Sequence, residues 1–380
     1  MERVYLDHAA TSPMHPEVID EMTTVMKETF GNPSSIHSFG RASRHLVDHA
    51  RTIIAESIHA EYNEIIFTSG GTEADNLAII GSAEANIANG KHIITTQTEH
   101  HAVLHACAFL ESKGFEVTYL PVDRSGRISM EDLQKELRDD TILVTIMFGN
   151  NEVGTLQPIK EIGELLKDHQ AYFHSDAVQA FGLTAMNVQE LGVDLLSVSG
   201  HKINGPKGIG FLYTHKNVDI LPRLYGGEQE RKRRAGTENV PAISGLGKAV
   251  ELAQHSIEEK HSKLSELKKL LKETLTDDGI EFEENGSLEH GLPHVLNLSF
   301  PGTDVESMLV NLDMSGIAVS SGSACTAGSI EPSHVLVAMY GKQSERSRNS
   351  IRFSFGMGNT EEQIEWTAHE VAKIVKRLRA

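Results

Sequence analysis

Short apolar runs alternate with amphipathic segments along the chain from about residue 64. The runs are rich in β-branched residues and predict strands at EIIFTSGG, KHIITTQ, FEVTYLPV, TILVTIMF, AYFHSDA, DLLSVSG and GIGFLYTH. The segments between them have apolar residues at helical spacing and predict helices, among them TEADNLAIIGSAEAN, TEHHAVLHACAFLESKG, SMEDLQKELRDD and PIKEIGELLKDHQ. This alternation is typical of a mainly parallel sheet with helices on both faces, so the pattern predicts a large α/β domain.

The pattern changes at Pro241, where a long charged segment with apolar residues at helical spacing begins. Beyond it, the strand-like runs HVLNLSF and SIRFSF alternate with helix-like segments. We place a domain boundary near residue 255, inside this predicted long helix. Residues 1–255 are expected to form the large domain, whose N-terminal segment can pack on the small one, and residues 256–380 a smaller α+β domain.

Composition narrows the class of protein. The 380 residues, 39% of them hydrophobic, suffice for two cores, and no run approaches the roughly 20 apolar residues that a spanning helix needs. The start MERVYLDHAATSPMHPE has no apolar signal core, and two distant cysteines without an extracellular cue predict thiols in a reducing compartment. A formal net charge of −18 argues against direct nucleic-acid binding. We therefore expect a cytoplasmic protein that contacts neither membrane nor nucleic acid.

Two reactive polar residues follow the ends of predicted strands, where ligands bind in open α/β sheets. Asp176 ends the run AYFHSDA, and Lys202 follows the glycine that ends DLLSVSG. A lysine lifted into a crevice loses hydration, which lowers its pKa and suits imine formation with an aldehyde. A carboxylate that faces a pyridine nitrogen keeps that nitrogen protonated, so the ring accepts electrons more readily. Taken singly, Asp176 could be only a helix cap and Lys202 only a surface charge.

Another strand end is followed by a Ser-Gly-Gly turn in FTSGGTEADN, with a helix expected to begin near Thr72. Glycines allow close backbone approach, and free N–H groups at a helix start attract an anion such as phosphate. A strand-to-helix turn without a ligand would have a similar sequence. The coincidence of such a turn, an aspartate and a lysine at strand ends of one sheet favours a shared site.

Further polar residues could join this site. His100 opens the helix after KHIITTQ, where an imidazole could lie against a bound ring and shuttle protons, with a core or surface histidine as the alternative. Asn150 and Asn151 follow TILVTIMF and could bond a ring hydroxyl or cap a turn. His101 and His105 have a spacing that suits a metal, but no third ligand follows in a recognisable pattern, so we expect no metal site.

The two cysteines have different surroundings. Cys107 lies among apolar residues in AVLHACAFL and is expected to be a buried hydrophobe. Cys325 lies in SSGSACTAGS, a run of small and polar residues without a large apolar anchor. We predict a mobile exposed loop over about residues 320–331, whose thiol is there because it reacts.

Together these segments resemble the cysteine desulfurases of the NifS/IscS type, members of the fold-type I superfamily of enzymes that use pyridoxal 5′-phosphate. The resemblance extends over nearly the whole chain and is carried by YLDHAATSPM, FGNPSSIHSFGR, FTSGGTEADN, TEHHAVL, NNEVGT, HSDAVQ, SGHKINGPKGIG, RAGTENV, SSGSACTAGS, EPSHVL and RNSIRFSFG. It implies a large domain with a mainly parallel sheet flanked by helices, and a smaller α+β domain. The cysteine-bearing segment distinguishes this group from related aminotransferases.

The resemblance also implies the roles of individual residues. Lys202 forms the imine with the cofactor, Asp176 faces the pyridine nitrogen, and His100 stacks on the ring. The other implied cofactor contacts are Asn151 and Gln179 at the ring hydroxyl, and Gly71, Thr72, Ser199, His201 and, from the other subunit of a homodimer, Thr237 at the phosphate. Arg352, helped by Asn32, is implied to hold the substrate carboxylate.

The implied reaction converts L-cysteine to L-alanine and leaves the sulfur as a persulfide on Cys325, with Lys202 taking the Cα proton. A sulfur carrier must reach the cofactor and then an acceptor, which agrees with a cysteine on an unanchored loop. Members that serve iron–sulfur assembly have a C-terminal extension, whereas this chain ends at VKRLRA. We therefore expect a tRNA-thiolating enzyme as sulfur acceptor slightly more than an iron–sulfur scaffold.

Three other functions fit parts of the pattern. A class-V aminotransferase would not need Cys325 and would consume a keto acid. A selenocysteine lyase would show no activity with cysteine. A protein of another class, an idle partner or scaffold that keeps the fold, would be colourless when purified. The joint presence of Lys202, Asp176, His100, Arg352 and Cys325 argues against the idle protein.

Overall fold

The computed structural model of the chain describes residues 3–321 and 332–380. Seven strands form the central sheet of the large domain, in the order β2-β8-β7-β6-β5-β3-β4. They are β2 (Ile65–Thr68), β3 (His92–Thr96), β4 (Glu116–Leu120), β5 (Thr141–Thr145), β6 (Tyr172–Asp176), β7 (Leu195–Ser199) and β8 (Gly210–Thr214). Strand β8 runs antiparallel to β2 and β7, and the other pairs are parallel. The predicted mainly parallel sheet is confirmed.

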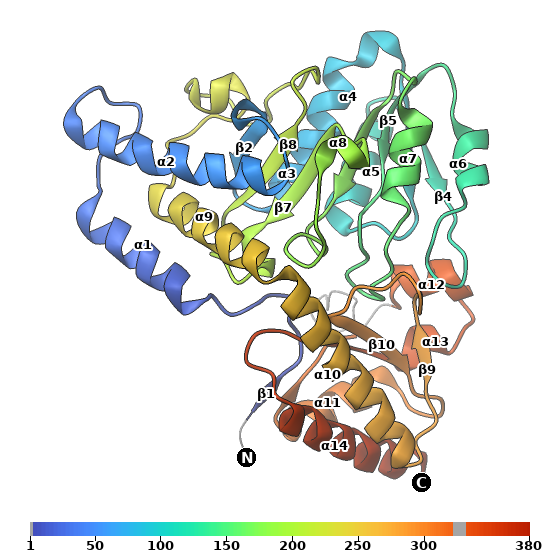
Figure 1. Ribbon diagram of the computed structural model, residues 1–380. Helices are drawn as coiled ribbons and strands as arrows, with labels where there is room; N and C mark the ends of the chain where they lie inside the picture. The colour runs from blue at the N-terminus through green and yellow to red at the C-terminus, as the bar shows by residue number, and fades with distance from the viewer. Residues whose placement is uncertain (1–2, 322–331) are drawn as a thin grey trace.

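Helices cover both faces of this sheet (Figure 1). Because successive side chains of a strand point to opposite faces, Phe67 and Ile94 join one apolar cluster while Ile66 and Ile93 join another. The helices are α1 (Pro16–Glu28), α2 (Ser38–Ser57), α3 (Gly71–Asn76), α4 (Ser82–Ala85), α5 (His101–Ser112), α6 (Met130–Glu136), α7 (Ile159–Leu166), α8 (Val188–Leu191) and α9 (Val240–His255). A π-helical turn, η2 (Leu77–Gly81), joins α3 to α4, and the 3-10 turns are η1 (Tyr62–Glu64), η3 (Ile87–Asn89), η4 (Gly200–Lys202) and η5 (Gln229–Lys232).

The smaller domain has an antiparallel sheet in the order β12-β10-β9 and a separate parallel pair, β1 with β11. Its strands are β1 (Val4–Tyr5), β9 (Glu283–Asn285), β10 (Val295–Ser299), β11 (Ile317–Ala318) and β12 (Ser350–Ser354), and its helices are α10 (Ile257–Asp277), α11 (Val305–Met314), α12 (His334–Tyr340), α13 (Arg346–Asn349) and α14 (Glu361–Arg379). Through β1, the N-terminal segment packs on this domain, where Val4 and Leu6 join its apolar core.

The long helix predicted from Pro241 is wrong in one respect. Helix α9 ends at His255, Ser256 leaves the helical conformation (φ −124°, ψ 14°), and α10 begins at Ile257. The two helices serve different cores, since Leu246 packs in the large domain and Leu271 in the small one. Figure 1 shows the change of direction between the two helices. The chain thus passes from one apolar core to the other between these helices, and the domain bounds 1–255 and 256–380 stay a prediction.

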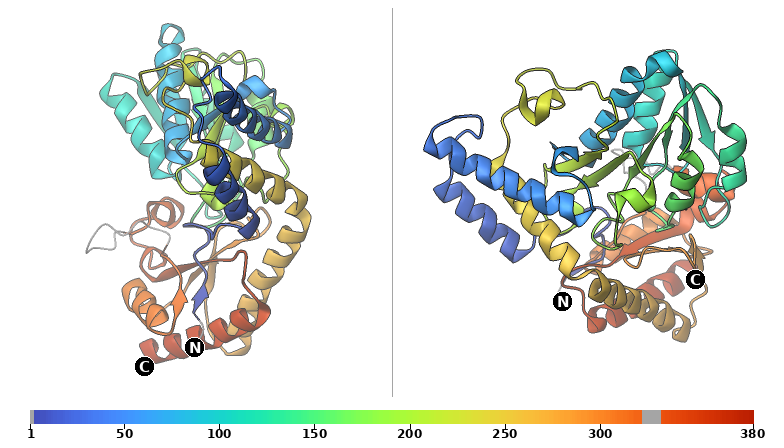
Figure 2. Two further views of the ribbon diagram at one scale, coloured as in Figure 1. Left: turned by 90° about the vertical axis from the view of Figure 1, so that its left-hand side faces the viewer. Right: turned by 45° about the horizontal axis from the view of Figure 1, so that its top comes forward.

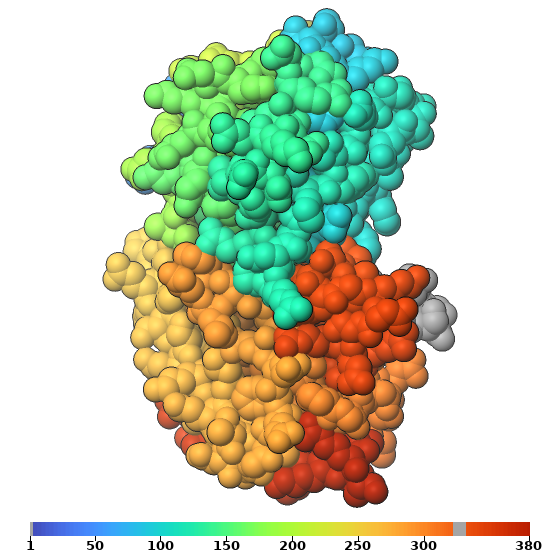
Figure 3. Space-filling view, turned by 90° about the vertical axis from the view of Figure 1, so that its right-hand side faces the viewer, coloured from blue at the N-terminus to red at the C-terminus, as the bar shows by residue number. Residues whose placement is uncertain are grey.

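The two domains lie in contact, with the large domain above the small one in the side view of Figure 2 and on the face drawn in Figure 3. Contacts that join them include a small apolar cluster of Val153 with Val335, Leu336 and Met339. Among the helices of the described residues, none is long and apolar enough to cross a membrane.

Candidate active site

A cavity of about 370 Å³ lies where β6 and β7 end and the small domain meets the large one. Ten of the residues predicted from the sequence line it: Gly71, Thr72, His100, Asn151, Asp176, Gln179, Ser199, His201, Lys202 and Arg352. Asn32 and Thr237 are not among the described residues that line this cavity, and Cys325 lies outside the described residues. The topology thus gathers side chains from both domains at one edge of the sheet.

Lys202 ends the turn η4, which directly follows β7. Its Nζ donates hydrogen bonds to the carbonyl oxygens of Ala9, at 2.5 Å, and Ala10, at 2.9 Å. Burial, together with the positive charge of Arg352, lowers the pKa of Lys202 to about 8. About a tenth of this amine is therefore unprotonated at pH 7, far more than for an ordinary lysine, and this is the form that attacks a carbonyl carbon.

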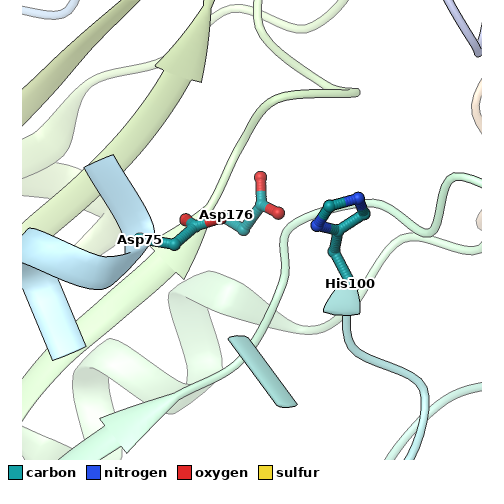
Figure 4. Close-up of side chains that lie close together, drawn as sticks. All are labelled: Asp75, His100 and Asp176. Atoms are coloured by element: carbon teal, nitrogen blue, oxygen red, sulfur yellow. The ribbon is translucent and has the colours of Figure 1, made fainter. Parts of the chain in front are cut away.

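Asp176 and His100 face each other across the cavity (Figure 4). Asp176 is 5% exposed, and its Oδ1 accepts a hydrogen bond from the Val178 backbone N–H at 2.9 Å. His100 is the N-cap of α5, where its Nδ1 accepts from the Ala102 N–H at 3.1 Å and leaves Nε2 for another partner. Burial lowers the pKa of His100, which favours the neutral ring suited to stacking and proton transfer.

The amide of Gln179 has a fixed orientation. Its Nε2 donates to the carbonyl oxygen of Ala9 at 2.9 Å, and its Oε1 lies 3.1 Å from Nε2 of His294. His294 is buried, and burial with the nearby positive charges lowers its pKa to about 3, so the neutral ring donates this hydrogen bond. One N–H of Gln179 remains for a ring oxygen of a bound ligand.

Arg352, on β12, is 4% exposed and held from two sides. Its Nη2 lies 2.7 Å from Oδ1 of Asp7, and its Nη1 donates to the carbonyl oxygen of Asn151 at 2.9 Å. Its Nε is buried and has no hydrogen-bond partner among the described residues. A buried guanidinium with an unused N–H is ready to bind a carboxylate.

The start of α3 leaves room for an anion. Its N-cap, Gly70, has φ 145°, and a Cβ on Gly71 would lie 2.8 Å from Cγ2 of Val178, so only glycine fits there. Ser199 and His201 line the same cavity, and burial lowers the pKa of His201 to about 4. An amine for an aldehyde, a carboxylate for a pyridine nitrogen and a phosphate cradle in one cavity fit pyridoxal 5′-phosphate.

Sequence reasoning did not assign several residues that build this site. Asp7 holds Arg352, His294 holds Gln179, and Asp75 lies beside Asp176 (Figure 4). Asp7 and Asp75 stand inside the quoted segments YLDHAATSPM and FTSGGTEADN, but nothing in a linear segment indicates which distant side chain each will meet.

The second missed group anchors the small domain. Glu152 accepts a hydrogen bond from the Ser333 hydroxyl, and Nε2 of His334 lies 2.9 Å from the carbonyl oxygen of Glu99. Burial raises the pKa of Glu152 to about 7. These contacts bring the start of α12 against the cavity wall.

Comparisons with known proteins agree with this site. Residues 4–366 match the family described as aminotransferase class-V. The IscS 1 protein of Bacillus subtilis (strain 168) is 63% identical over 378 residues that cover 100% of both chains. The cysteine desulfurase IscS of Methanosarcina thermophila is 53% identical, over 99% of this chain and 93% of its own. A solved structure described as a NifS-like protein superposes with a TM-score of 0.92 at 36% identity, over 99% of this chain and 100% of that one.

Proposed function

We infer the reaction from the family: the chain belongs to the class-V aminotransferases and, within them, to the pyridoxal phosphate-dependent cysteine desulfurases of the NifS/IscS type. L-cysteine is the substrate, and L-alanine and enzyme-bound sulfur are the products. The observation that carries the assignment is the gathering of Lys202, Asp176 and Arg352 in one cavity. Here a nucleophilic amine, an acid for a pyridine nitrogen and a carboxylate receptor stand together.

The chain's own residues have distinct tasks in this reaction. When bound, the cofactor supplies an electron sink for the carbon skeleton of the substrate. Arg352, held by Asp7, is proposed to bind the substrate carboxylate, and Lys202 to accept the Cα proton. The sulfur of Cys325 then forms an S–S bond to the substrate sulfur as the Cβ–S bond breaks, which leaves a persulfide on the enzyme. His100 is proposed to stack on the ring and move protons.

The protein is proposed to act as a homodimer. Thr237 does not line the cavity of its own chain, so its implied phosphate contact requires another subunit. Large apolar side chains are exposed nearby in sequence, at Tyr225 (82%), and on the α1–α2 connection, at Ile36 (91%). Such surface favours an interface. Asn32 lies on that same connection, so its proposed contact with substrate is also expected to come from a partner subunit.

The sulfur acceptor is proposed to be a protein, either a tRNA-thiolating enzyme or an iron–sulfur scaffold. Transfer of labelled sulfur from the loaded enzyme to each purified acceptor class would separate the two. The excess of acidic over basic residues, 53 against 35, supports delivery to a protein rather than direct contact with RNA. The cytoplasmic location remains a prediction from composition.

The decisive experiment measures intact mass before and after addition of L-cysteine. We expect a reducible gain of one sulfur in the wild type, with release of alanine, and no gain in Cys325→Ser although that variant keeps its cofactor. Cys107→Ala is the matched control, because this buried thiol has a pKa raised by burial and lies apart from the cavity lining. Persulfide on Cys325→Ser at the wild-type level would overturn the assignment of the sulfur carrier.

A further inference from the structure

Five polar side chains form a buried cluster at the cavity, in which Asp75 and Asp176 line the cavity and the other three lie behind them. Thr145, His174 and Ser197 are each 0% exposed, Asp75 is 1% exposed, and Asp176 is 5% exposed. Four of them come from the strands β5, β6 and β7, and Asp75 comes from α3. The family roles of Lys202, His100 and Arg352 do not involve this cluster, except through Asp176.

Hydrogen bonds join three members of the cluster, Thr145, His174 and Ser197. Oγ1 of Thr145 lies 2.8 Å from Nδ1 of His174, and Nε2 of His174 lies 2.9 Å from Oγ of Ser197. Burial lowers the pKa of His174 to about 3, so the ring is neutral and has a single N–H. Burial raises the pKa of Asp75, and the hydroxyl of Ser197 lies close enough to its carboxyl to lower that pKa by a smaller amount. The neutral ring of His174 donates at one nitrogen and accepts at the other, so it joins Thr145 to Ser197.

Asp75 is left with an unsatisfied oxygen. Its Oδ1 is buried and finds no hydrogen-bond partner in the part of the chain that the structure describes. One oxygen of Asp75, one oxygen of Asp176 and a nitrogen of His100 lie within 4.8 Å of one another. Burial and the neighbouring carboxylate raise the pKa of Asp75 well above its ordinary value. Two enclosed carboxyl groups this close favour a single negative charge between them, because each charge raises the cost of the other in surroundings that exclude water.

The surroundings decide which of the two keeps the proton. Asp176 accepts the Val178 N–H and lies near His100 and Lys202, all of which favour its anionic form. Asp75 has the hydroxyl of Ser197 and a neutral imidazole, with Nε2 of His174 3.7 Å from its Oδ1. The anion therefore belongs on Asp176.

We propose that Asp75 is a permanently protonated, neutral carboxylic acid that positions Asp176 and leaves it as the single anion of the pair. Its role is to fill the space beside Asp176 with a polar group that adds no charge. Asp176 thereby stays anionic towards a pyridine nitrogen. The inference rests on the cofactor site proposed above for the role of Asp176, but the protonation state of Asp75 can be measured without cofactor.

Infrared difference spectroscopy of the apo-protein tests the proton directly. The wild type should show a C=O stretching band of a protonated carboxylic acid that shifts in deuterated water and is absent from Asp75→Asn. Glu99 is the matched control, because it is also fully enclosed and burial raises its pKa to about 8. Glu99→Gln should lose a different band and keep that of Asp75. A spectrum of Asp75→Asn with every wild-type acid band would overturn the proposal.

Cofactor binding provides the second measurement. Asparagine resembles a protonated aspartic acid in shape and charge, so Asp75→Asn should keep cofactor affinity within about threefold of the wild type, and Asp176→Asn should lose about tenfold or more. A tenfold loss in Asp75→Asn, with an unchanged melting temperature, would mean that the native Asp75 is charged. Wild-type cofactor affinity in Asp176→Asn would instead contradict the proposed cofactor site. The infrared result on the protonation of Asp75 would remain valid, because it is measured without cofactor.

Discussion

Two buried clusters of ionisable side chains in the large domain differ in how their charges are balanced. In one, Arg51 and Glu230 form a two-pronged ion pair, with Nη2 2.6 Å from Oε1 and Nη1 2.8 Å from Oε2. Arg51 also donates to the carbonyl oxygen of Ile65, and Glu230 accepts the Phe67 N–H, so both charges are matched. In the other, the carboxyl groups of Asp75 and Asp176 lie side by side, and Oδ1 of Asp75 has no hydrogen-bond partner among the described residues.

This difference distinguishes a structural cluster from a functional one. Arg51 links α2 and the edge strand β2 to a segment in which Glu230, Arg231 and Lys232 have positive φ angles of 48°, 56° and 67°, a conformation that needs external support. A satisfied pair supplies that support. At the cavity, polar groups without a hydrogen-bond partner among the described residues are available to bind a ligand or a proton. These groups do not add to the stability of the fold.

The largest expected effect is on turnover, from a substitution in the cavity. Lys202→Ala should lower turnover by about 10³-fold or more, since it removes both the cofactor's anchoring amine and the proposed proton acceptor. Alanine release measures the loss, and the melting temperature of the apo-protein should stay near that of the wild type because Lys202 bonds only two carbonyl oxygens. Substantial turnover in this variant would contradict the assigned role.

A substitution in the structural cluster should mainly lower the free energy of unfolding. Arg51→Ala leaves Glu230 as an unpaired buried charge, so we expect a loss of about 3–5 kcal/mol in the free energy of unfolding. Denaturant titration of the apo-protein measures it. Arg138→Ala is the control, because Arg138 forms ion pairs with Glu116 and Asp140 at the surface and should change stability far less. Equal losses in the two variants would remove the distinction between the clusters.

The pH dependence of cofactor uptake tests the lowered pKa of Lys202 in the functional cluster. Below a pH of about 8, the rate at which apo-protein takes up pyridoxal phosphate should fall about tenfold per pH unit, since only the unprotonated Lys202 amine reacts. Stopped-flow absorbance measures the rate. In Arg352→Gln the midpoint should rise towards the ordinary lysine value of 10.5, because a nearby positive charge is gone. A wild-type midpoint near 10.5 would exclude the buried amine.

The smallest expected effect concerns the support of Arg352. Asp7→Asn keeps a hydrogen-bond acceptor but removes the charge opposite Nη2, so the guanidinium is held less firmly. We expect KM for L-cysteine to rise about fivefold with little change in kcat. Steady-state kinetics separate the two constants. A fall in kcat with constant KM would assign Asp7 to the chemical step instead.

Much of the fold could be predicted because it rests on local patterns. The seven runs predicted as strands are all strands of the central sheet. Asp176 is the last residue of β6, and His100 and Lys202 lie a few residues beyond the ends of β3 and β7, as expected. The break at Ser256 was missed because both flanking segments favour helix, and their apolar residues join different cores only in the folded chain.

The sequence by itself determined the order of strands and helices, the residues available at strand ends and, through its motifs, the family. Only the tertiary structure decided which carboxylate lies beside Asp176, which aspartate holds Arg352 and which imidazole holds Gln179. Local patterns encode spacing along one element. The pKa and orientation of a buried group depend on burial and on charges contributed by distant segments, and these arise only when the chain is folded.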